Sequence, residues 1–116
     1  MKQTVYALVR YQDCAAAVDF LTSAFGFAVH EVSKNDEGVV NHVELVAGDD
    51  KFMLGIGKPG GPGVYVAVED VDAHHDHARA AGAHITMEPV DQPYGSRDYG
   101  CTDPEGNQWW FGTYRP

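Results

Sequence analysis

Short stretches of alternating or β-branched residues, each followed by apolar residues at helical spacing, occur twice along the chain. The first, TVYALVRY, spans residues 4–11, and the second, GVYVAVE, spans residues 63–69. Alternation of this kind predicts strands. Each following stretch begins with an aspartate that can cap a helix and ends with a glycine that can stop one. These residues are Asp13 and Gly26 in the first half, and Asp70 or Asp72 and Gly82 in the second.

Three further strands are predicted after each helix. They span 27–33, 40–47 and 51–57 in the first half, and 84–89, 97–102 and 108–114 in the second. Each half therefore follows the order β-α-β-β-β. We expect one α+β domain over residues 1–116, with a module at about 4–57, a Gly/Pro linker at 57–63 and a second module at about 63–115. Neither half can bury its helix and open sheet alone, so the two must pack together.

The period of two assigns the strand side chains to two faces. The rows predicted to lie under the helices are Val5, Ala7 and Val9; Val43 and Leu45; and Val64, Val66 and Val68. The opposite face then carries Tyr6, His42, Glu44 and Tyr65 among apolar residues. A mixture of this kind is typical of a wall that binds a ligand.

The net charge of −9 argues against nucleic acid or an anionic membrane as a partner, since both attract basic patches. It favours a cationic ligand, or serves solubility alone. No apolar run approaches the roughly 20 residues that a membrane helix needs, and the N-terminus lacks the pattern of a signal peptide. The two cysteines, Cys14 and Cys101, lie far apart, so we expect a cytoplasmic protein without a disulfide scaffold.

Three motifs of the chain resemble the glyoxalase/bleomycin-resistance group of the vicinal oxygen chelate superfamily. They are the strand, Asp13, helix and Phe-Gly-Phe over 5–27, the Tyr-Gly-Ser-Arg-Asp segment at 94–98, and the Asp-Pro-Glu-Gly-Asn turn at 103–107. The resemblance covers essentially the whole chain. It implies two βαβββ modules that form a curled mixed sheet with helices on the outer side, often by exchange between two chains. It also implies a homodimer whose chains share the cleft.

The metalloenzymes of this superfamily place one metal ligand on each of strands one, four, five and eight. Carried over by motif, these positions fall on Tyr6, Leu54, Gly63 (or its neighbour Val64) and Trp110. These side chains lack the carboxylates and imidazoles that divalent cations require. The resemblance is therefore to the metal-free branch, and we expect neither a metal nor another cofactor. Trp110 is either a stacking platform in the cleft or a core residue that fills the place of a metal site.

Three other groups of polar residues are candidates for a site. His42 and Glu44 form either an acid/base pair or a hydrogen-bonded pair along a strand. Arg97 either holds a ligand anion or pairs with Asp98. The histidines and aspartates within 70–77 look like a metal cluster, but they open the second helix, so we expect a solvent-exposed helix surface.

The expected function is the binding or sequestration of a small organic molecule, cationic or antibiotic-like, in an aromatic-lined cleft. The predicted ligand-binding residues are Tyr6, His42, Leu54, Tyr65, Arg97 and Trp110. One alternative is a lyase, isomerase or dioxygenase of the same superfamily, with His42 and Glu44 as catalytic candidates. Another is an accessory interaction module with a filled cleft. Fold alone does not decide between them.

Overall fold

The structure, a computed structural model, describes residues 2–116. The first module consists of β1 (Leu8–Tyr11), α1 (Cys14–Phe25), β2 (Ala28–Lys34), β3 (Val40–Ala47) and β4 (Asp50–Ile56). The second consists of β5 (Val64–Ala67), α2 (Val71–Ala80), β6 (His84–Asp91), β7 (Arg97–Thr102) and β8 (Gln108–Gly112). The predicted α+β fold of two βαβββ modules is confirmed. Neither helix is long and apolar enough to cross a membrane.

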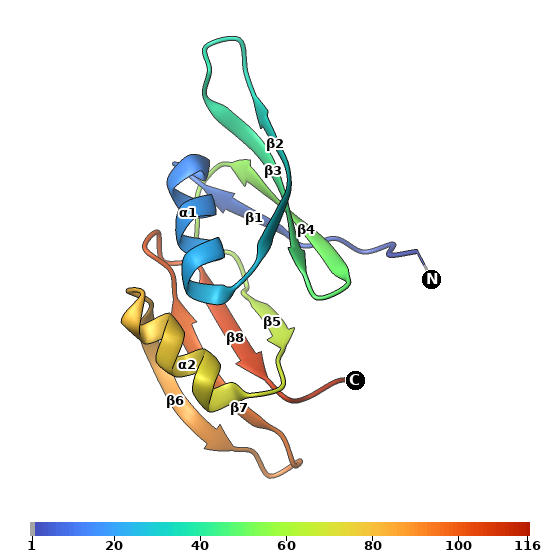
Figure 1. The fold of residues 1–116 in the computed structure, drawn as a ribbon, viewed down its shortest axis with the longest axis vertical. Helices are drawn as coiled ribbons and strands as arrows, with labels where there is room; N and C mark the ends of the chain where they lie inside the picture. Colours follow the sequence, from blue (N-terminus) through green and yellow to red (C-terminus); the bar gives the residue numbers. More distant parts are fainter. Residues whose placement is uncertain (1) are drawn as a thin grey trace.

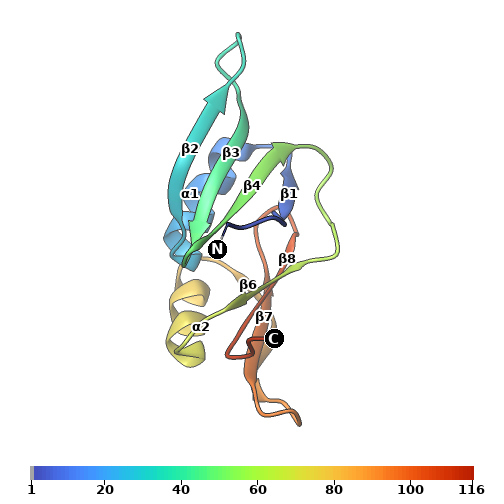
Figure 2. The ribbon, with the colours of Figure 1, turned by 90° about the vertical axis from the view of Figure 1, so that its right-hand side faces the viewer.

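Each module forms its own four-stranded mixed sheet, in the order β1-β4-β3-β2 and β5-β8-β7-β6. β1 runs parallel to β4 and β5 runs parallel to β8, whereas the other neighbouring strands are antiparallel. Both helices lie on the same side of the molecule, each over the sheet of its own module (Figures 1 and 2). The face of each sheet that points away from its helix is called the open face below.

The predicted assignment of side chains to faces agrees with the burial of the strands except at Val5, which precedes β1 and is 82% exposed. Val9, Val43 and Leu45 are buried in the core under α1, and the row of Val64, Val66 and Val68 packs against the same core. The register places these residues on the first open face: Leu8, Arg10, His42, Glu44, Met53 and Gly55. It places these on the second: Tyr65, Asp98, Gly100, Trp110 and Gly112.

Several strand boundaries differ from the predicted ones, and β5 spans Val64–Ala67 in place of 63–69. β1 begins at Leu8, and of the backbone groups before it the Ala7 carbonyl accepts from the Met53 N–H at 2.9 Å. β8 ends at Gly112. β6 continues past Pro89 to Asp91. A proline is tolerated there since β6 is an edge strand with shifts of register along it.

The two modules share one aromatic core. Trp109 of β8 packs against three phenylalanines of the first module, with ring centroids 5.5 to 5.7 Å apart. These are Phe25, Phe27 and Phe52. Aromatic rings at such distances contribute contact energy beyond the burial of their area. The expectation that the halves must pack together is therefore right.

A buried carboxylate in the turn between β7 and β8 ties the second module to the first. Asp103 accepts hydrogen bonds from the Tyr11 hydroxyl of β1 and, over 3.0 Å, from the Trp109 indole N–H. Its other oxygen accepts from the backbone N–H groups of Glu105 and Asn107. Burial, reinforced by the bond to Asp103, raises the pKa of Tyr11 far above its usual value. The phenol therefore stays protonated and remains a donor to Asp103.

Two more side chains of the same turn bind backbone groups outside it. The Glu105 carboxylate accepts from the N–H groups of Gln12 and Asp13, at 2.7 and 3.0 Å, where the chain enters α1. Asn107 donates to the Arg10 carbonyl at 2.9 Å, and its amide oxygen accepts from the N–H of Gly60 in the linker at 2.7 Å. The Asp-Pro-Glu-Gly-Asn turn thus satisfies polar backbone groups at the module interface.

Replacing Tyr11 with Phe removes one side-chain donor to Asp103 and leaves the aromatic ring in place. We expect the free energy of unfolding to fall by about 1–3 kcal/mol, because a buried acceptor loses its partner. Tyr6→Phe is the matched control, since the Tyr6 hydroxyl donates to the Gln3 carbonyl at an exposed site; it should change stability by less than about 0.5 kcal/mol. Urea denaturation compares the proteins, and equal midpoints for Tyr11→Phe and wild type would contradict the role of Asp103.

Candidate functional site

Trp110 lies on the second open face, between Tyr65 of β5 and Gly100 of β7. Successive side chains of a strand point to opposite faces, so Trp109 enters the core and Trp110 points away from it. Trp109 is fully buried, and Trp110 is partly exposed. Trp110 is therefore not part of the buried core.

Two glycines make room for the groups on this face. A Cβ atom on Gly100 would overlap with the six-membered ring of Trp110, which lies over that glycine. A Cβ atom on Gly112 would overlap with the carboxylate of Asp98 and the hydroxyl of Tyr65. Neither glycine has a positive φ, so space and not backbone conformation explains the choice of residue. The indole and the carboxylate occupy the volume that side chains at these two positions would fill.

Asp98 is a buried carboxylate surrounded by hydroxyl groups. It accepts hydrogen bonds from Tyr65 at 2.9 Å, from Tyr94 at 3.2 Å and from Ser96 at 3.0 Å. The Tyr65 oxygen in turn accepts from the N–H of Tyr114 at 2.9 Å. Burial, followed by the hydrogen bond to Asp98, raises the pKa of Tyr65 to about 12. The Tyr65 phenol is therefore protonated at neutral pH and keeps its proton directed at Asp98.

A cleft of about 650 Å³ lies between the modules. Its walls come from β4, β5, the ends of the helices and the segment before β1, and they include Ala7, Phe27, Phe52, Tyr65, Val66 and His74. This volume is in the range of sites for drug-sized molecules. Tyr65 connects this cleft to the second open face, whereas His42, Leu54, Arg97 and Trp110 do not line it.

The four positions carried over from the metalloenzymes do not meet on one face. Leu54 is fully buried and pairs with Val9 and Val43, so it points to the core under α1. The Leu54 side chain is therefore closed to a ligand in the single chain, and the open face belongs to its neighbours on β4. Tyr6 lies in the extended segment before β1, and Gly63 ends the linker with a φ of 101°.

The residues at these positions do not fit a divalent cation. Leu54 and Gly63 offer no side-chain ligand, and the indole N–H of Trp110 is a donor only. Within residues 2–116, no group of three or more His, Cys, Asp or Glu side chains is arranged to hold a metal ion.

His42 and Glu44 lie side by side on the first open face. The His42 Nε2 atom is 3.3 Å from one oxygen of Glu44, and the Nε2 atom of His30 is 3.8 Å from the other. All three side chains are partly exposed. The carboxylate between two imidazoles has the geometry of a proton-transfer group and equally that of a polar pair on a strand.

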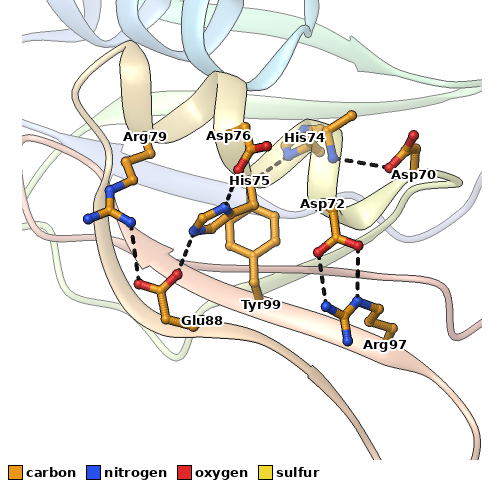
Figure 3. A network of polar contacts seen from close by, with 10 residues as sticks. Asp70, Asp72, His74, His75, Asp76, Arg79, Glu88, Arg97 and Tyr99 are labelled. Atoms are coloured by element: carbon orange, nitrogen blue, oxygen red, sulfur yellow. Dashed lines mark hydrogen bonds and ion pairs between the residues drawn. The ribbon is translucent and has the colours of Figure 1, made fainter.

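Arg97 points toward α2, away from the open face (Figure 3). Its guanidinium makes two hydrogen bonds to Asp72, at 3.0 and 3.2 Å, and one to Asp91 at 3.1 Å. These contacts raise the pKa of Arg97 above its usual value. The expected pair with Asp98 is wrong, because the guanidinium is held by Asp72 and Asp91 and Asp98 lies on the other face of the strand. A contact of Arg97 with a ligand anion stays a prediction.

The polar residues at the start of α2 are also less exposed than the sequence indicates. Figure 3 shows His75 between Asp76 and Glu88, with ring nitrogens 2.9 and 2.8 Å from their carboxylates. His75 is buried against Tyr99. The expectation of a fully solvated helix surface is wrong here, because β6 and β7 pack beneath this part of α2.

Two other histidines of α2 bind the end of α1. The Nε2 atom of His74 lies 3.1 Å from the Phe25 carbonyl, and that of His77 lies 2.7 Å from the Ser23 carbonyl. Carbonyls in the last turn of a helix have no partner within the helix. The Nδ1 atom of His74 contacts the hydroxyl of Tyr99. A neutral His74 that donates from Nε2 and accepts from Tyr99 at Nδ1 satisfies both contacts.

A family model for the glyoxalase/bleomycin resistance protein/dioxygenase superfamily matches residues 3–111. The chain therefore belongs to this superfamily, as its motifs and its paired βαβββ modules indicate. No curated protein sequence matches the chain.

Solved structures give the same fold. TioX from Micromonospora sp. ML1 is 31% identical, with 98% of each chain covered and a TM-score of 0.82. A superfamily member from Sphaerobacter thermophilus DSM 20745 is 23% identical, with 97% of each chain covered and a TM-score of 0.78. A glyoxalase-related enzyme from Clostridium phytofermentans is 22% identical, with 97% of this chain and 95% of that enzyme covered and a TM-score of 0.79. The similarity extends over both modules.

The position of His74 predicts a pH dependence of stability. Burial lowers its pKa below the usual 6.5, and nearby His77 lowers it further, against an opposing effect of the bond to Phe25. The unfolded chain therefore binds a proton more readily, and the free energy of unfolding should decrease as the pH falls below about 6.5.

His74→Phe tests this dependence, because it keeps a ring beside Phe111 and removes the titrating group. We expect a less stable protein at neutral pH with a shallower decrease of stability toward acidic pH, measured by urea denaturation at several pH values. His30→Gln, at an exposed histidine, is the control and should keep the wild-type slope. A slope in His74→Phe as steep as that of the wild type would exclude His74 as its source.

Proposed function

We propose that the protein binds and sequesters a small organic molecule, with the second open face as its main binding surface. The observation that carries this proposal is the pair of glycines, Gly100 and Gly112, that make room for the Trp110 ring and the Asp98 carboxylate. A larger residue at either position would displace the platform or the charge. An aromatic surface with a few placed polar groups is the usual composition of a ligand site.

The proposal includes a homodimer in which a second copy covers the open faces. Leu8 and Tyr65, one on each open face, are 44% and 40% exposed in the single chain. A twofold pairing of the first open face with the partner's second one would cover these side chains and form two equivalent sites.

An aromatic, antibiotic-like compound is the ligand class we propose. The Trp110 ring offers a surface for stacking, and such contacts are worth about 0.5–1.5 kcal/mol beyond the buried area. The net charge of −9 favours a cationic compound through the field of the whole protein.

Trp110→Leu tests the stacking platform. We expect about tenfold weaker binding of a planar probe such as acridine, since the flat surface is lost. Quenching of tryptophan fluorescence and calorimetry measure binding to the wild type, and calorimetry alone suffices for the variant. Phe20→Leu, which removes a partly buried aromatic ring on α1, on the helix side of the sheets, is the control and should bind as the wild type does.

Sedimentation at the concentrations of the titration reports whether the binding species is a dimer. If no planar compound binds the wild type, the stacking function of Trp110 is wrong; if no small organic compound binds at all, an accessory module with a filled cleft takes the place of the sequestering function. If Trp110→Leu binds as tightly as the wild type, the ligand lies elsewhere, and the cleft between the modules is the remaining site.

A second candidate is acid/base catalysis by His42 and Glu44, favoured by the carboxylate that lies between two imidazoles. In this case a bound compound should be converted by the wild type and remain unchanged with His42→Gln, at similar affinity for both proteins. Mass spectrometry of the recovered ligand decides, and an unchanged ligand after incubation with the wild type excludes this activity for that compound.

A further inference from the structure

We propose that Tyr65, Tyr94 and Tyr114, with Asp98 beneath them, form a receptor for an ammonium group. This inference rests on the proposed function in that it names the chemical class of the ligand on the second open face. The part of the ligand that these residues would bind is a protonated or quaternary amine, beside the aromatic part that would stack on Trp110.

The hydrogen bonds of Asp98 determine how the hydroxyl groups are oriented. An ionised carboxylate only accepts hydrogen bonds, so Tyr65, Tyr94 and Ser96 all direct their protons at Asp98. Each hydroxyl has one proton, and its remaining capacity is to accept. The Tyr65 oxygen uses this capacity for the N–H of Tyr114. The Tyr94 oxygen retains lone pairs for a donor that approaches from solvent.

The rings around this carboxylate are exposed and inclined to one another. Tyr94 and Tyr114 meet edge to face, with centroids 5.7 Å apart and planes at 81°. They are 64% and 46% exposed, so their faces are accessible in the single chain. The faces of aromatic rings attract cations, most strongly where a cation is partly removed from water.

The charge of Asp98 is not balanced by a neighbouring side chain. Within residues 2–116, Asp98 makes no ion pair with Lys, Arg or His. Arg97, the adjacent cation in the sequence, points to the opposite face and pairs with Asp72 and Asp91. A buried carboxylate without a counter-charge stabilises a cation placed nearby. Hydroxyl oxygens, aromatic faces and this charge all favour a positive ligand group and disfavour an anion.

Choline and its uncharged carbon analogue, 3,3-dimethylbutan-1-ol, are the two probes. They have nearly the same shape and differ in charge, so a difference in their affinities measures the effect of the charge. Chemical shifts of the tyrosine ring resonances, followed by NMR during titration, measure the affinity of each probe. We expect the wild type to bind choline about tenfold more tightly than the analogue. The same affinity for both probes would overturn the proposal.

Three variants locate the effect. Asp98→Asn keeps the size of the side chain and removes its charge, and it should abolish most of the preference for choline. Tyr94→Leu removes an exposed ring wall and should reduce choline affinity several-fold even if Asp98→Asn fails to fold. Asp36→Asn is the control: it removes the same charge from the turn between β2 and β3, which lies at the opposite end of the molecule from the turn between β6 and β7 that carries Tyr94 (Figure 1). A preference that survives in both Asp98→Asn and Tyr94→Leu, or is lost in Asp36→Asn, contradicts the site.

The choline titration tests the ammonium receptor and the acridine titration tests stacking on Trp110, so either hypothesis can be refuted without the other. Binding of acridine without a preference for choline refutes the ammonium receptor and leaves the sequestering function intact. A preference for choline without binding of acridine or any other planar compound supports the receptor and refutes the stacking function of Trp110.

Discussion

The structure depends on one buried carboxylate, that of Asp103. It binds the Tyr11 hydroxyl of the first module and the Trp109 indole of the second, so it fixes how the two modules lie relative to each other. The aromatic contacts of Trp109 with Phe25 and Phe27 fill the space behind it. Without this arrangement each module would be a helix on a four-stranded sheet, with the aromatic residues that contact the other module exposed. The cleft between the modules and the orientation of both open faces follow from it.

The sequence predicted the strands and their faces well wherever the alternation of side chains alone determines which face a residue lies on. Alternation placed Val43 and Leu45 under the first helix and His42 and Glu44 on the other face, and no long-range contact was needed for that step. The motif-based position on β4 failed by one residue. Because a shift of one residue exchanges the two faces of a strand, Leu54 moved from the wall of a site to the core. A motif on a distant segment locates a strand position only to within about one residue. An error of one residue is enough to assign the side chain to the wrong face of the strand.

The second kind of error concerns contacts that no local pattern reveals. Arg97 and the histidines of α2 were judged from their own neighbours in the sequence. Their partners lie on other elements: Asp72 on α2 for Arg97, Glu88 on β6 for His75 and the Phe25 carbonyl for His74. Which element packs against which face is a property of the assembled modules. Gly112 belongs to the same class, since a glycine at the end of a strand gives no signal that a carboxylate occupies the space above it.

The same pair of strands serves both stability and binding. Along β7 and β8 one set of side chains, with Tyr99, Trp109 and Phe111, is fully buried, while the alternate set carries Asp98 and Trp110. Because each residue of the open face is bonded to two residues of the core, the backbone beneath the proposed site is held by the packing on its other side. Binding groups on such a backbone are ordered before the ligand arrives, which lowers the entropic cost of association. The Tyr94 ring, outside the strands and exposed, is the group with freedom to adapt.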